Sequence, residues 1–403
     1  MEKKPVFAIF IIFIGLSTSS NASGNISGYT PSKHAEFSLL TNTPGRELYT
    51  IFGHSAIRYK DSLYDVDIVY NYGTFDFSTP YFYLKFIKGK LNYFLSVQSF
   101  DHYFIWTDDT QTIYEQKLQL TLSQKKELIR FLENNYQGEN RFYLYDFFFD
   151  NCATRIRDAL KKTFLDDVTF EFFEPPHDRT FRQLLDPYIM KYPWVDLGID
   201  LALGMEADKI AAPREYMFLP DYLMEAFSVA SIRHDNEMMP LVNENQTLKE
   251  GTPDHFMSEY YMAPVFVFWT IFGIILVISF LGYKTNRINV WIDRITFGIT
   301  GLLGLLFIFL WIGTNHAVMQ NNLNIIWALP TNILLLFIIN RKERFLKLLN
   351  HYYLILTIIL LVFLATSRLL PQEFHFSIYP LVLIQLTRSI MNYKRYQKIQ
   401  KHP

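Results

Sequence analysis

Hydrophobic residues are distributed unevenly along this chain of 403 residues. Up to about residue 260, polar and apolar residues alternate as they do in a water-soluble domain, whereas the rest of the chain is almost continuously apolar. Stretches of this length and composition are typical of membrane-spanning helices. The pattern therefore predicts a soluble head followed by an all-α membrane domain of five helices, over residues 264–283, 295–313, 323–340, 351–368 and 374–391.

The N-terminus has the pattern of an export signal. Two lysines precede an apolar run over residues 6–16, and small residues follow around Ala22 and Ser23. The run is too short to cross a bilayer, so we interpret residues 1–23 as a signal peptide. An uncleaved anchor is the alternative interpretation.

Basic residues are concentrated in alternate connections of the apolar half. Residues 284–294, 341–350 and the C-terminal tail carry Lys and Arg, whereas 314–322 and 369–373 carry none. Cytoplasmic loops are enriched in Lys and Arg, so the tail is predicted to be cytoplasmic and the head periplasmic. Export signal and loop charges agree on a multi-pass protein of the inner (cytoplasmic) membrane.

The head is predicted to be an α+β domain. Strand patterns cover residues 48–60 and 63–77, further short strands are expected near 90–97 and 112–118, and a helix is expected over 123–136. Polar residues from 235 onward indicate a linker before the first membrane helix. The predicted division is a signal peptide at 1–23, a head at 24–234, a linker at 235–262 and a membrane domain with its tail at 263–403.

Composition and motifs exclude several functions. A net charge of −1 gives no general electrostatic attraction to nucleic acid. The chain has no G-x-x-x-x-G-K-[ST], no H-E-x-x-H and no pair of cysteines, so no cofactor and no metal site are predicted.

Cys152 is the only cysteine of the chain. In an exported protein it has no disulfide partner within its own chain, so it is either an inert buried residue or a thiol kept for its reactivity. Asp150 and Asn151 favour a helix start, and residues 153–164 have a helical pattern. The sulfur is therefore predicted in the first turn, where free N–H groups and the helix dipole stabilise a thiolate.

A nucleophilic thiol needs a base that is close in space. His54 is the best candidate, because Gly53 before it permits close approach of another backbone or a substrate at the start of a strand. His177 and His316 are the alternatives. Asn71 and Asp76 are candidates for a third, orienting group, although both are also ordinary turn formers.

Further polar residues are candidates for substrate binding. Arg58, Arg155 and Arg157 could converge on a phosphate, which arginine binds through two hydrogen bonds, or could form surface ion pairs with Asp158 or Asp61. Asn151 lies next to the thiol and is a further candidate for orienting or binding. Polar residues at 315–332 either line a cavity or form an interfacial loop.

Several segments resemble one family. FGHSAIR, VYNYGTFDF, YLYDFFFDNCATRIRD, VDLGIDLALGMEADK and EYMFLPDYLM are similar to segments of the Lnb-type lipoprotein N-acyltransferases, over about residues 30–230, and the multi-span half has the matching layout. The resemblance implies a thiol acyltransferase that uses Cys152 and His54. It also implies a permuted papain-like fold, akin to NlpC/P60 proteins, and the N-terminal amine of a diacylated lipoprotein as substrate.

We therefore predict an enzyme that moves an acyl chain from a phospholipid, through a Cys152 thioester, to the N-terminal amine of a diacylated lipoprotein. One alternative is a membrane-anchored Cys-His peptidase or amidase that acts on the cell wall; one anchor would suffice for that substrate, whereas five spans suit a lipid. The other alternative is a non-enzymatic membrane scaffold, which assigns no role to the single thiol.

Overall fold

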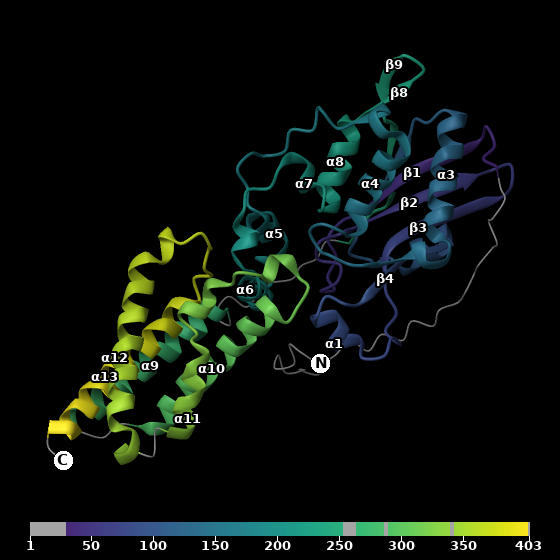
Figure 1. The fold of residues 1–403 in the computed structure, drawn as a ribbon. Coiled ribbons are helices and arrows are strands. Elements are labelled where there is room, and N and C mark those ends of the chain that lie inside the picture. Colours follow the sequence, from purple (N-terminus) through teal and green to yellow (C-terminus); the bar gives the residue numbers. More distant parts are fainter. Residues whose placement is uncertain (1–29, 253–262, 286–288, 339–341, 402–403) are drawn as a thin grey trace.

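The computed structural model describes residues 30–252, 263–285, 289–338 and 342–401. The predicted signal peptide lies outside the described residues. A head built on a β-sheet and a bundle of long helices lie end to end (Figure 1). Residues 30–252 form the head, and the remaining segments form the bundle, here called the membrane half.

The head is built on a seven-stranded sheet in which every neighbouring pair is antiparallel. The strand order is β10-β5-β1-β2-β3-β4-β6, so β1 and β2 lie in the middle. The strands are β1 (Ala35–Asn42), β2 (His54–Asp61), β3 (Val66–Thr74), β4 (Asn92–Ser99), β5 (Ile113–Leu118), β6 (Phe142–Leu144) and β10 (Val242–Lys249). A smaller sheet joins β7 (Val168–Thr169), β8 (Ser231–His234) and β9 (Glu237–Pro240).

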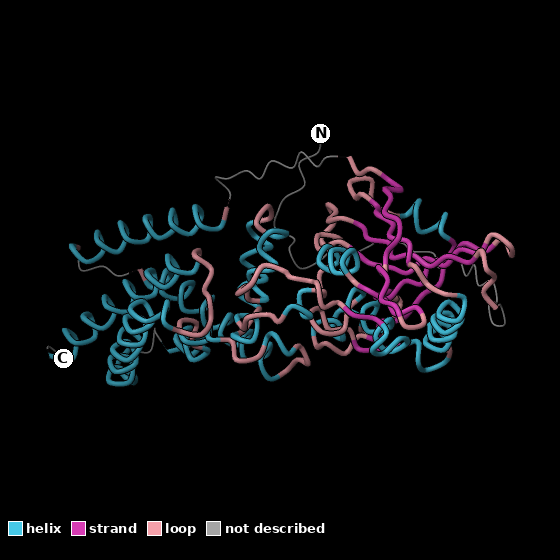
Figure 2. Tube along the Cα trace, turned by 90° about the horizontal axis from the view of Figure 1, so that it is seen from above, coloured by secondary structure: helices cyan, strands magenta, loops and turns pink. Residues whose placement is uncertain are grey.

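Alternation along the strands produces two unequal faces. Ile57 and Tyr59 of β2 point into the main core, which lies under α3 (Leu122–Tyr136), α4 (Cys152–Phe164) and α8 (Pro220–Val229). Ala56 points to the other face, where α2 (Phe100–Trp106) covers a small cluster with Tyr103. Figure 2 shows the strands between these layers, with the larger helical layer below them. Other short helices are α1 (Phe82–Ile87), α5 (Phe181–Ile189), α6 (Pro193–Ala202) and α7 (Pro213–Tyr216).

Most of the predicted head elements are present. The helix predicted over 123–136 is α3, which is capped by Thr121, and the predicted strands correspond to β2, β3, β4 and β5. Residues 48–53, however, form turns rather than the start of a strand. The sequence pattern does not predict β1, because this central strand is buried on both faces and does not alternate.

The predicted linker is wrong over its first part. Residues 235–249 continue the fold as β9 and β10, and β10 pairs with β5 as an edge strand of the main sheet. An edge strand with one exposed face carries many polar residues, which explains why the segment looks like a linker in the sequence. Residues 253–262 of the predicted linker lie outside the described residues.

The membrane half contains helices that are long and apolar enough to cross a bilayer. Among the described residues, three meet this criterion: α9 (Pro264–Lys284), α10 (Val290–Ile312) and Phe345–Leu369, which includes most of α12 (Lys342–Thr366). A pair of short helical segments, 317–326 and 330–338, is bent by 58° and makes a fourth span if both halves belong to one crossing.

The predicted count of five spans is therefore not confirmed. The third predicted segment is broken before Pro330, which has no N–H to continue a helix. The fifth corresponds to α13 (Ile378–Lys401), which carries buried Gln385, Arg388 and Asn392 and ends in a basic tail. These polar residues make α13 too polar to meet the criterion by composition alone.

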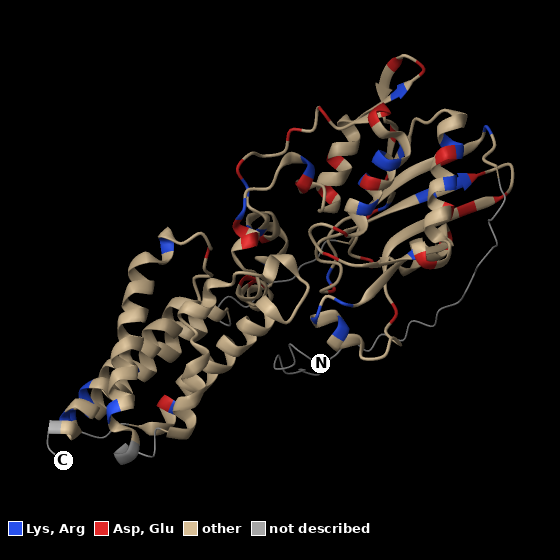
Figure 3. Ribbon diagram, viewed as in Figure 1, with Lys and Arg blue, Asp and Glu red and all other residues tan. Residues whose placement is uncertain are grey.

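Charge and exposure match a bundle embedded in lipid. The apolar stretch of α9 is 6% buried, so its side chains face outward, as apolar residues can in a bilayer. Figure 3 shows Lys and Arg gathered at the end of the bundle away from the head. That distribution agrees with a cytoplasmic tail under the positive-inside rule.

The polar cluster at 315–332 joins the two halves of the molecule. Asn322 Nδ2 donates to the carbonyl of Leu201 at 2.8 Å, and the N–H of Gly204 donates to the carbonyl of Val318 at 2.8 Å. Gly204 has to be glycine for this approach, because a Cβ there would lie 1.8 Å from the carbonyl oxygen of Gln320. The amides in the first part of the cluster thus hold the head in place.

A buried ion pair links three helices of the membrane half. Arg388 of α13 donates to Asp293 of α10 at 2.6 Å and to Ser279 Oγ of α9 at 2.9 Å. Both charged side chains are almost completely buried, with exposed fractions of 1% and 0%. Removing one partner would leave the other charge buried and unpaired.

We expect Arg388→Met to destabilise the protein by about 3–5 kcal/mol, because it leaves the Asp293 carboxylate buried without its ionic partner. The measurement is thermal unfolding of the full chain in detergent. Arg388→Met combined with Asp293→Leu should recover much of the loss, and Lys394→Met, at an exposed position of the same helix, should have little effect. Equal losses in the single and double variants would contradict the account.

Candidate active site

The start of α4 holds Cys152 in a fixed place. Asn151 is the N-cap, with its Oδ1 accepting from the N–H of Thr154 at 2.9 Å, while Thr154 Oγ1 accepts from the N–H of Asn151 at 2.8 Å. The Asn151 Nδ2 group also donates to the carbonyls of Phe147 and Phe218, at 2.8 and 2.7 Å. Cys152 is therefore the first residue of the helix, which confirms the prediction of a sulfur in the first turn.

The turn before β2 places His54. Gly53 has a φ of 74°, and a Cβ there would lie 2.6 Å from the carbonyl oxygen of Asn42 on β1. Only glycine meets both conditions, so this residue allows the chain to enter β2 next to β1. His54 is the first residue of β2, at the same end of the sheet as the N-terminus of α4.

The neighbouring strand β3 supplies an amide to the imidazole. Asn71 Oδ1 lies 2.7 Å from His54 Nε2. An amide oxygen can only accept, so Nε2 carries the proton and Nδ1 is left to face the sulfur. The second ring contact of His54 is a hydrogen bond with the Cys152 side chain.

A bulge in β3 brings the helix and the strand together. The pairing of β3 with β4 shifts between Asn71 and Thr74, and Gly73 has a φ of 90°. A Cβ on Gly73 would lie 3.6 Å from Cys152 Cβ, so the strand passes directly beside the thiol. Bulges often redirect side chains next to functional sites, and here the bulge leaves Asn71 facing His54.

Charge stabilises the deprotonated sulfur. Burial is the largest single influence and raises the pKa of the Cys152 thiol. The positive charge of His54, its hydrogen bond and the N–H groups of Ser55 and Ala153 together outweigh burial, so the net pKa is lowered. Burial alone would lower the pKa of His54, yet the charge of Cys152 and hydrogen bonds to Cys152 and Asn71 raise it. Both directions favour a thiolate–imidazolium pair.

Three tyrosines lie near the buried thiol. Burial first, and then the negative charge of Cys152, raise the pKa of Tyr103, Tyr143 and Tyr145. These phenols therefore stay neutral, and they add bulk rather than charge around the sulfur. Tyr103 also donates to Asn42 Oδ1 at 2.9 Å, which ties α2 to this end of the sheet.

The structure does not bring Asp76 to this cluster. Asp76 is exposed, and its carboxylate accepts from the N–H and Oγ of Ser78 at 2.8 and 2.7 Å, as a turn former does. Of the two residues considered for the third position, only Asn71 contacts His54. The alternative histidines lie elsewhere: His177 is exposed, and His316 Nε2 lies 3.2 Å from the carbonyl of Phe86.

The arginines considered for phosphate binding are engaged in ion pairs. Arg58 donates twice to Asp67, at 2.7 and 2.6 Å, and once to Glu115 at 3.1 Å, so its partner is not Asp61. Arg155 binds Asp150 and lies 3.8 Å from the ring centroid of Tyr143. The Arg157 side chain pairs with Asp158, as one alternative expected.

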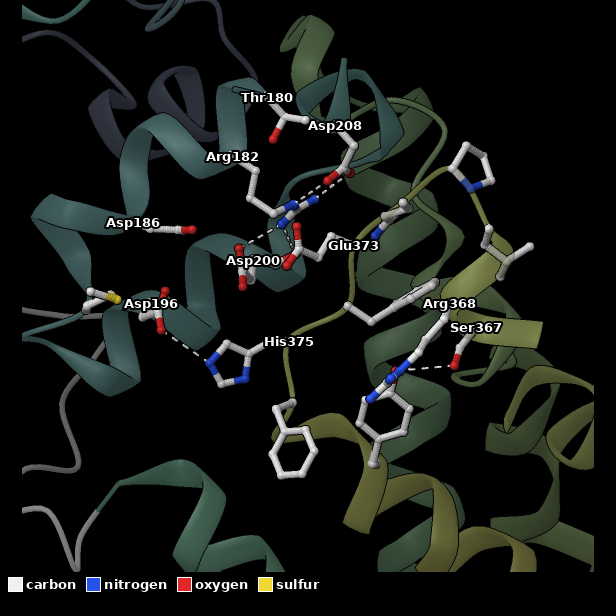
Figure 4. A pocket seen from close by; sticks show the side chains of 17 residues that line it. Thr180, Arg182, Asp186, Asp196, Asp200, Asp208, Ser367, Arg368, Glu373 and His375 are labelled. Carbon is white, nitrogen blue, oxygen red and sulfur yellow. Dashed lines mark hydrogen bonds and ion pairs between the residues drawn. The ribbon is translucent and has the colours of Figure 1, made fainter. Parts of the chain in front are cut away.

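A second polar cluster lies where the head meets the membrane half. It surrounds a cavity of about 700 Å³. Arg182, which is 2% exposed, donates to Asp200 at 2.7 Å and to Asp208 at 2.8 Å (Figure 4). Asp196, Asp200 and His375 place one potential ligand atom each within 4.8 Å of one another, so they could hold a cation.

Sequence reasoning missed this cluster. Burial first, and then the charges of Asp200 and Asp196, raise the pKa of Asp186 to about 6. His375 belongs to the last connection of the membrane half and meets Asp196 only through the docking of the two halves, at 3.3 Å. Nothing in the local sequence around either residue signals that contact.

Fold and site together define a class of protein: a helical membrane anchor that carries a sheet domain with a thiol, an imidazole and an amide in contact. Residues 25–185 match the family model of the Lnb N-terminal periplasmic domain, and residues 256–399 match the Lnb transmembrane domain. The chain therefore belongs to the Lnb-type family, as a lipoprotein-processing membrane protein with a periplasmic head. Comparisons with the curated proteins and with the solved structures gave no match.

The lowered pKa of Cys152 is open to direct measurement. We expect iodoacetamide to alkylate this single thiol with a rate that rises with pH through a midpoint below that of a free cysteine, because the thiolate is the reactive form. His54→Ala should move the midpoint above that of a free cysteine, since burial remains and the cation is lost. Mass spectrometry of the intact chain gives the rates.

Two variants control the alkylation experiment. Asn71→Ala should raise the midpoint less than His54→Ala does, because it removes only the hydrogen bond that supports the imidazolium. Asp76→Ala should leave the midpoint unchanged. An identical midpoint in the wild type and in His54→Ala would contradict the proposed charge pairing.

Proposed function

We propose that this protein is a lipoprotein N-acyltransferase of the inner membrane, which transfers an acyl chain from a phospholipid to the N-terminal amine of a diacylated lipoprotein. The observation that carries the proposal is the cluster of Cys152, His54 and Asn71 in a periplasmic head that is joined to a membrane half. A thiol, an imidazole and an amide are the groups that Cys-His-Asn thiol enzymes use for acyl transfer.

The first half-reaction loads the enzyme. His54 takes the proton of the Cys152 thiol, and the sulfur attacks the carbonyl carbon of a phospholipid ester. When the tetrahedral intermediate collapses, the carbon–oxygen bond breaks, and His54 returns the proton to the departing alkoxide. The products are a lysophospholipid and a thioester on Cys152.

The second half-reaction transfers the chain. The neutral N-terminal amine of the lipoprotein attacks the thioester carbonyl while His54 accepts an amine proton. An amide bond forms, the carbon–sulfur bond breaks, and the thiolate and imidazolium are restored. Thioesters react readily with amines, so a site with little water favours transfer over hydrolysis.

Two further groups support these steps. Asn71 keeps Nε2 protonated, so that the lone pair of Nδ1 is directed at the sulfur. The N–H of Cys152 lies at the first position of α4, where no residue of the same helix can accept from it. We assign it as a donor to the oxyanion of the tetrahedral intermediate.

The arrangement of the head supports a permuted papain-like fold. The helix that starts with Cys152 packs on β2 and β3, the adjacent strands that carry His54 and Asn71. Both strands precede the helix in the chain, as the permuted arrangement requires. The same order supports the assignment of nucleophile, base and orienting amide.

The test in cells is the mass of lipoprotein N-terminal peptides. A host whose own N-acylation can be switched off should regain triacylated lipoproteins with the wild-type chain. Cys152→Ser and His54→Ala should lower the triacylated product by about a thousandfold or more, since each removes a group that takes part in both steps. Asn71→Ala should cost about 10- to 100-fold, as loss of an orienting partner does.

His177→Ala is the matched control for His54→Ala, because it removes an exposed histidine of the same head. It should support full triacylation. Full activity of Cys152→Ser would show that the thiol is structural. Unchanged lipoproteins together with altered cell-wall peptides would favour the peptidase or amidase instead.

The orientation in the membrane has its own test. Alkaline phosphatase fused after residue 252, the last described residue of the head, should be active, because the enzyme folds only outside the cytoplasm. A green fluorescent protein fused to the C-terminus should fluoresce, because it folds inside. The opposite result at either position would contradict the proposed topology.

A further inference from the structure

The helix α1 consists mainly of apolar residues, yet most of its side chains are exposed. None of its residues is buried, and Leu84, Phe86 and Ile87 are 50%, 50% and 37% exposed. Tyr81, the residue before it, is 79% exposed. A contiguous apolar surface of this kind is unfavourable in water and marks an interaction site.

Contacts place α1 beside the membrane half. The N–H of Asn315 donates to the carbonyl of Lys88 at 3.0 Å, and His316 Nε2 lies 3.2 Å from the carbonyl of Phe86. Both residues follow closely on α10, which ends at Ile312. The exposed helix therefore lies at the level where a predicted membrane span ends, and Figure 1 shows it next to that part of the bundle.

The turn after α1 is shaped for this contact. Gly89 has a φ of 63°, and a Cβ there would lie 3.2 Å from the His316 ring and 3.3 Å from Asn315 Cβ. A larger residue would push the loop away. The positive φ of Gly89 and the backbone hydrogen bond from Asn315 to Lys88 thus hold the C-terminal end of α1 beside the segment that follows α10.

Basic residues accompany the apolar surface. Lys85 lies on α1, and Lys88 and Lys90 follow it at the C-terminal end. A short apolar helix flanked by lysines is suited to the boundary between acyl chains and anionic headgroups. Charge and apolar surface thus favour a phospholipid leaflet over a protein partner as the occupant.

A row of aromatic rings runs from α1 to the nucleophile. Phe86 stacks on Phe82 at 6.4 Å, Phe82 contacts Phe75 at 5.8 Å, and Phe75 contacts Tyr93 at 5.3 Å. The row ends where Tyr93 stacks on Tyr145 at 4.3 Å.

The inner end of this row lies at the active site. A Cβ on Gly73 would be 3.9 Å from Tyr145 and 3.6 Å from Cys152, so both side chains flank the same glycine. Phe86 at the outer end is 50% exposed, Tyr93 is 7% exposed, and Tyr145 at the inner end is partly buried. The ring contacts therefore form a continuous series from α1 to the active site.

We propose that α1 is immersed in the head-side leaflet of the bilayer and that the aromatic row leads the acyl chain of a membrane phospholipid from α1 to Cys152. The second part rests on the proposed acyl transfer, whereas the immersion of α1 stands without it. The exposed face of α1 is then a lipid-binding surface in a part of the head that the catalytic groups do not use.

Immersion is tested with nitroxide labels on the full chain in phospholipid vesicles. In a Cys152→Ser background, Leu84→Cys and Met238→Cys provide single labelling positions of similar exposure, at 50% and 43%. Met238 belongs to the β8–β9 hairpin, which Figure 1 shows far from the bundle.

The label at position 84 should collide with oxygen and be protected from a water-soluble nickel chelate, and the label at 238 should behave in the opposite way. Free access of the chelate to position 84 overturns the proposal. Exclusion of both reagents also overturns it, because that result indicates a second copy of the chain or another protein over α1.

The acyl route is tested by charge placed on α1. With phospholipid vesicles as donor, Leu84→Glu combined with Ile87→Glu should slow acylation of Cys152 about tenfold, because charges oppose insertion of an apolar helix. With a water-soluble short-chain acyl thioester as donor, the rate should stay within about twofold of the wild type, since the catalytic groups are intact. Met238→Glu is the matched control and should change neither rate.

The outcomes separate the two proposals. If the double variant reacts with phospholipid as fast as the wild type, the route along α1 is refuted while acyl transfer stands. If the wild type reacts with the soluble thioester but never with phospholipid, the donor assignment and the route both fail. The nitroxide result then decides the immersion of α1 by itself.

Discussion

A thiolate can persist inside a protein only if positive charge and N–H groups lie beside it, because burial favours the neutral thiol. In this protein the contact between Cys152 and His54 meets that requirement, and the rest of the head is arranged around it. The cap by Asn151 fixes the helix that carries the sulfur, and the turn at Gly53 fixes the strand that carries the imidazole. Asn71 then fixes the ring itself.

The head, and with it the site, is also fixed relative to the membrane half of the chain. Amides of the membrane half, such as Asn322, bind backbone carbonyls of the head, and Gly204 lets the two backbones touch. The charged cavity around Arg182 lies at the same junction. Such contacts suit a head that has to hold one orientation toward lipid, because backbone hydrogen bonds leave less freedom than a linker would. An enzyme that acts on the cell wall would not need its head to be held in one orientation, so this junction favours a lipid substrate.

Local signals in the sequence were enough to propose the pair of side chains that the structure brings into contact, the Cys152 thiol and the His54 imidazole. A single cysteine after two good capping residues predicts a reactive thiol at a helix start, and a Gly-His pair before a strand predicts a tight turn. Asn71 and Asp76 could not be separated, because both occur in turn-forming context and only the bulge at Gly73 decides which one faces the imidazole.

Other features depend on contacts between distant parts of the chain. The partners of Arg58 lie on two different strands, so its role in ion pairs is visible only once the sheet is formed. Strand β1 lacks alternation because both of its faces are buried. The exposure of α1 and its contact with the segment after α10 are likewise visible only in the folded chain, because Lys88 and Asn315 are far apart in the sequence.

The central claim is that Cys152 carries the acyl group, and the most direct test is the intact mass of the purified full chain after incubation with phospholipid alone. The account predicts a gain of one fatty acyl group on the Cys152 peptide, its removal by hydroxylamine, and its transfer to a diacylated lipopeptide with a free amine but not to one with a blocked amine. Transfer that requires both substrates at once, with no adduct on Cys152 at any time, would contradict the covalent mechanism.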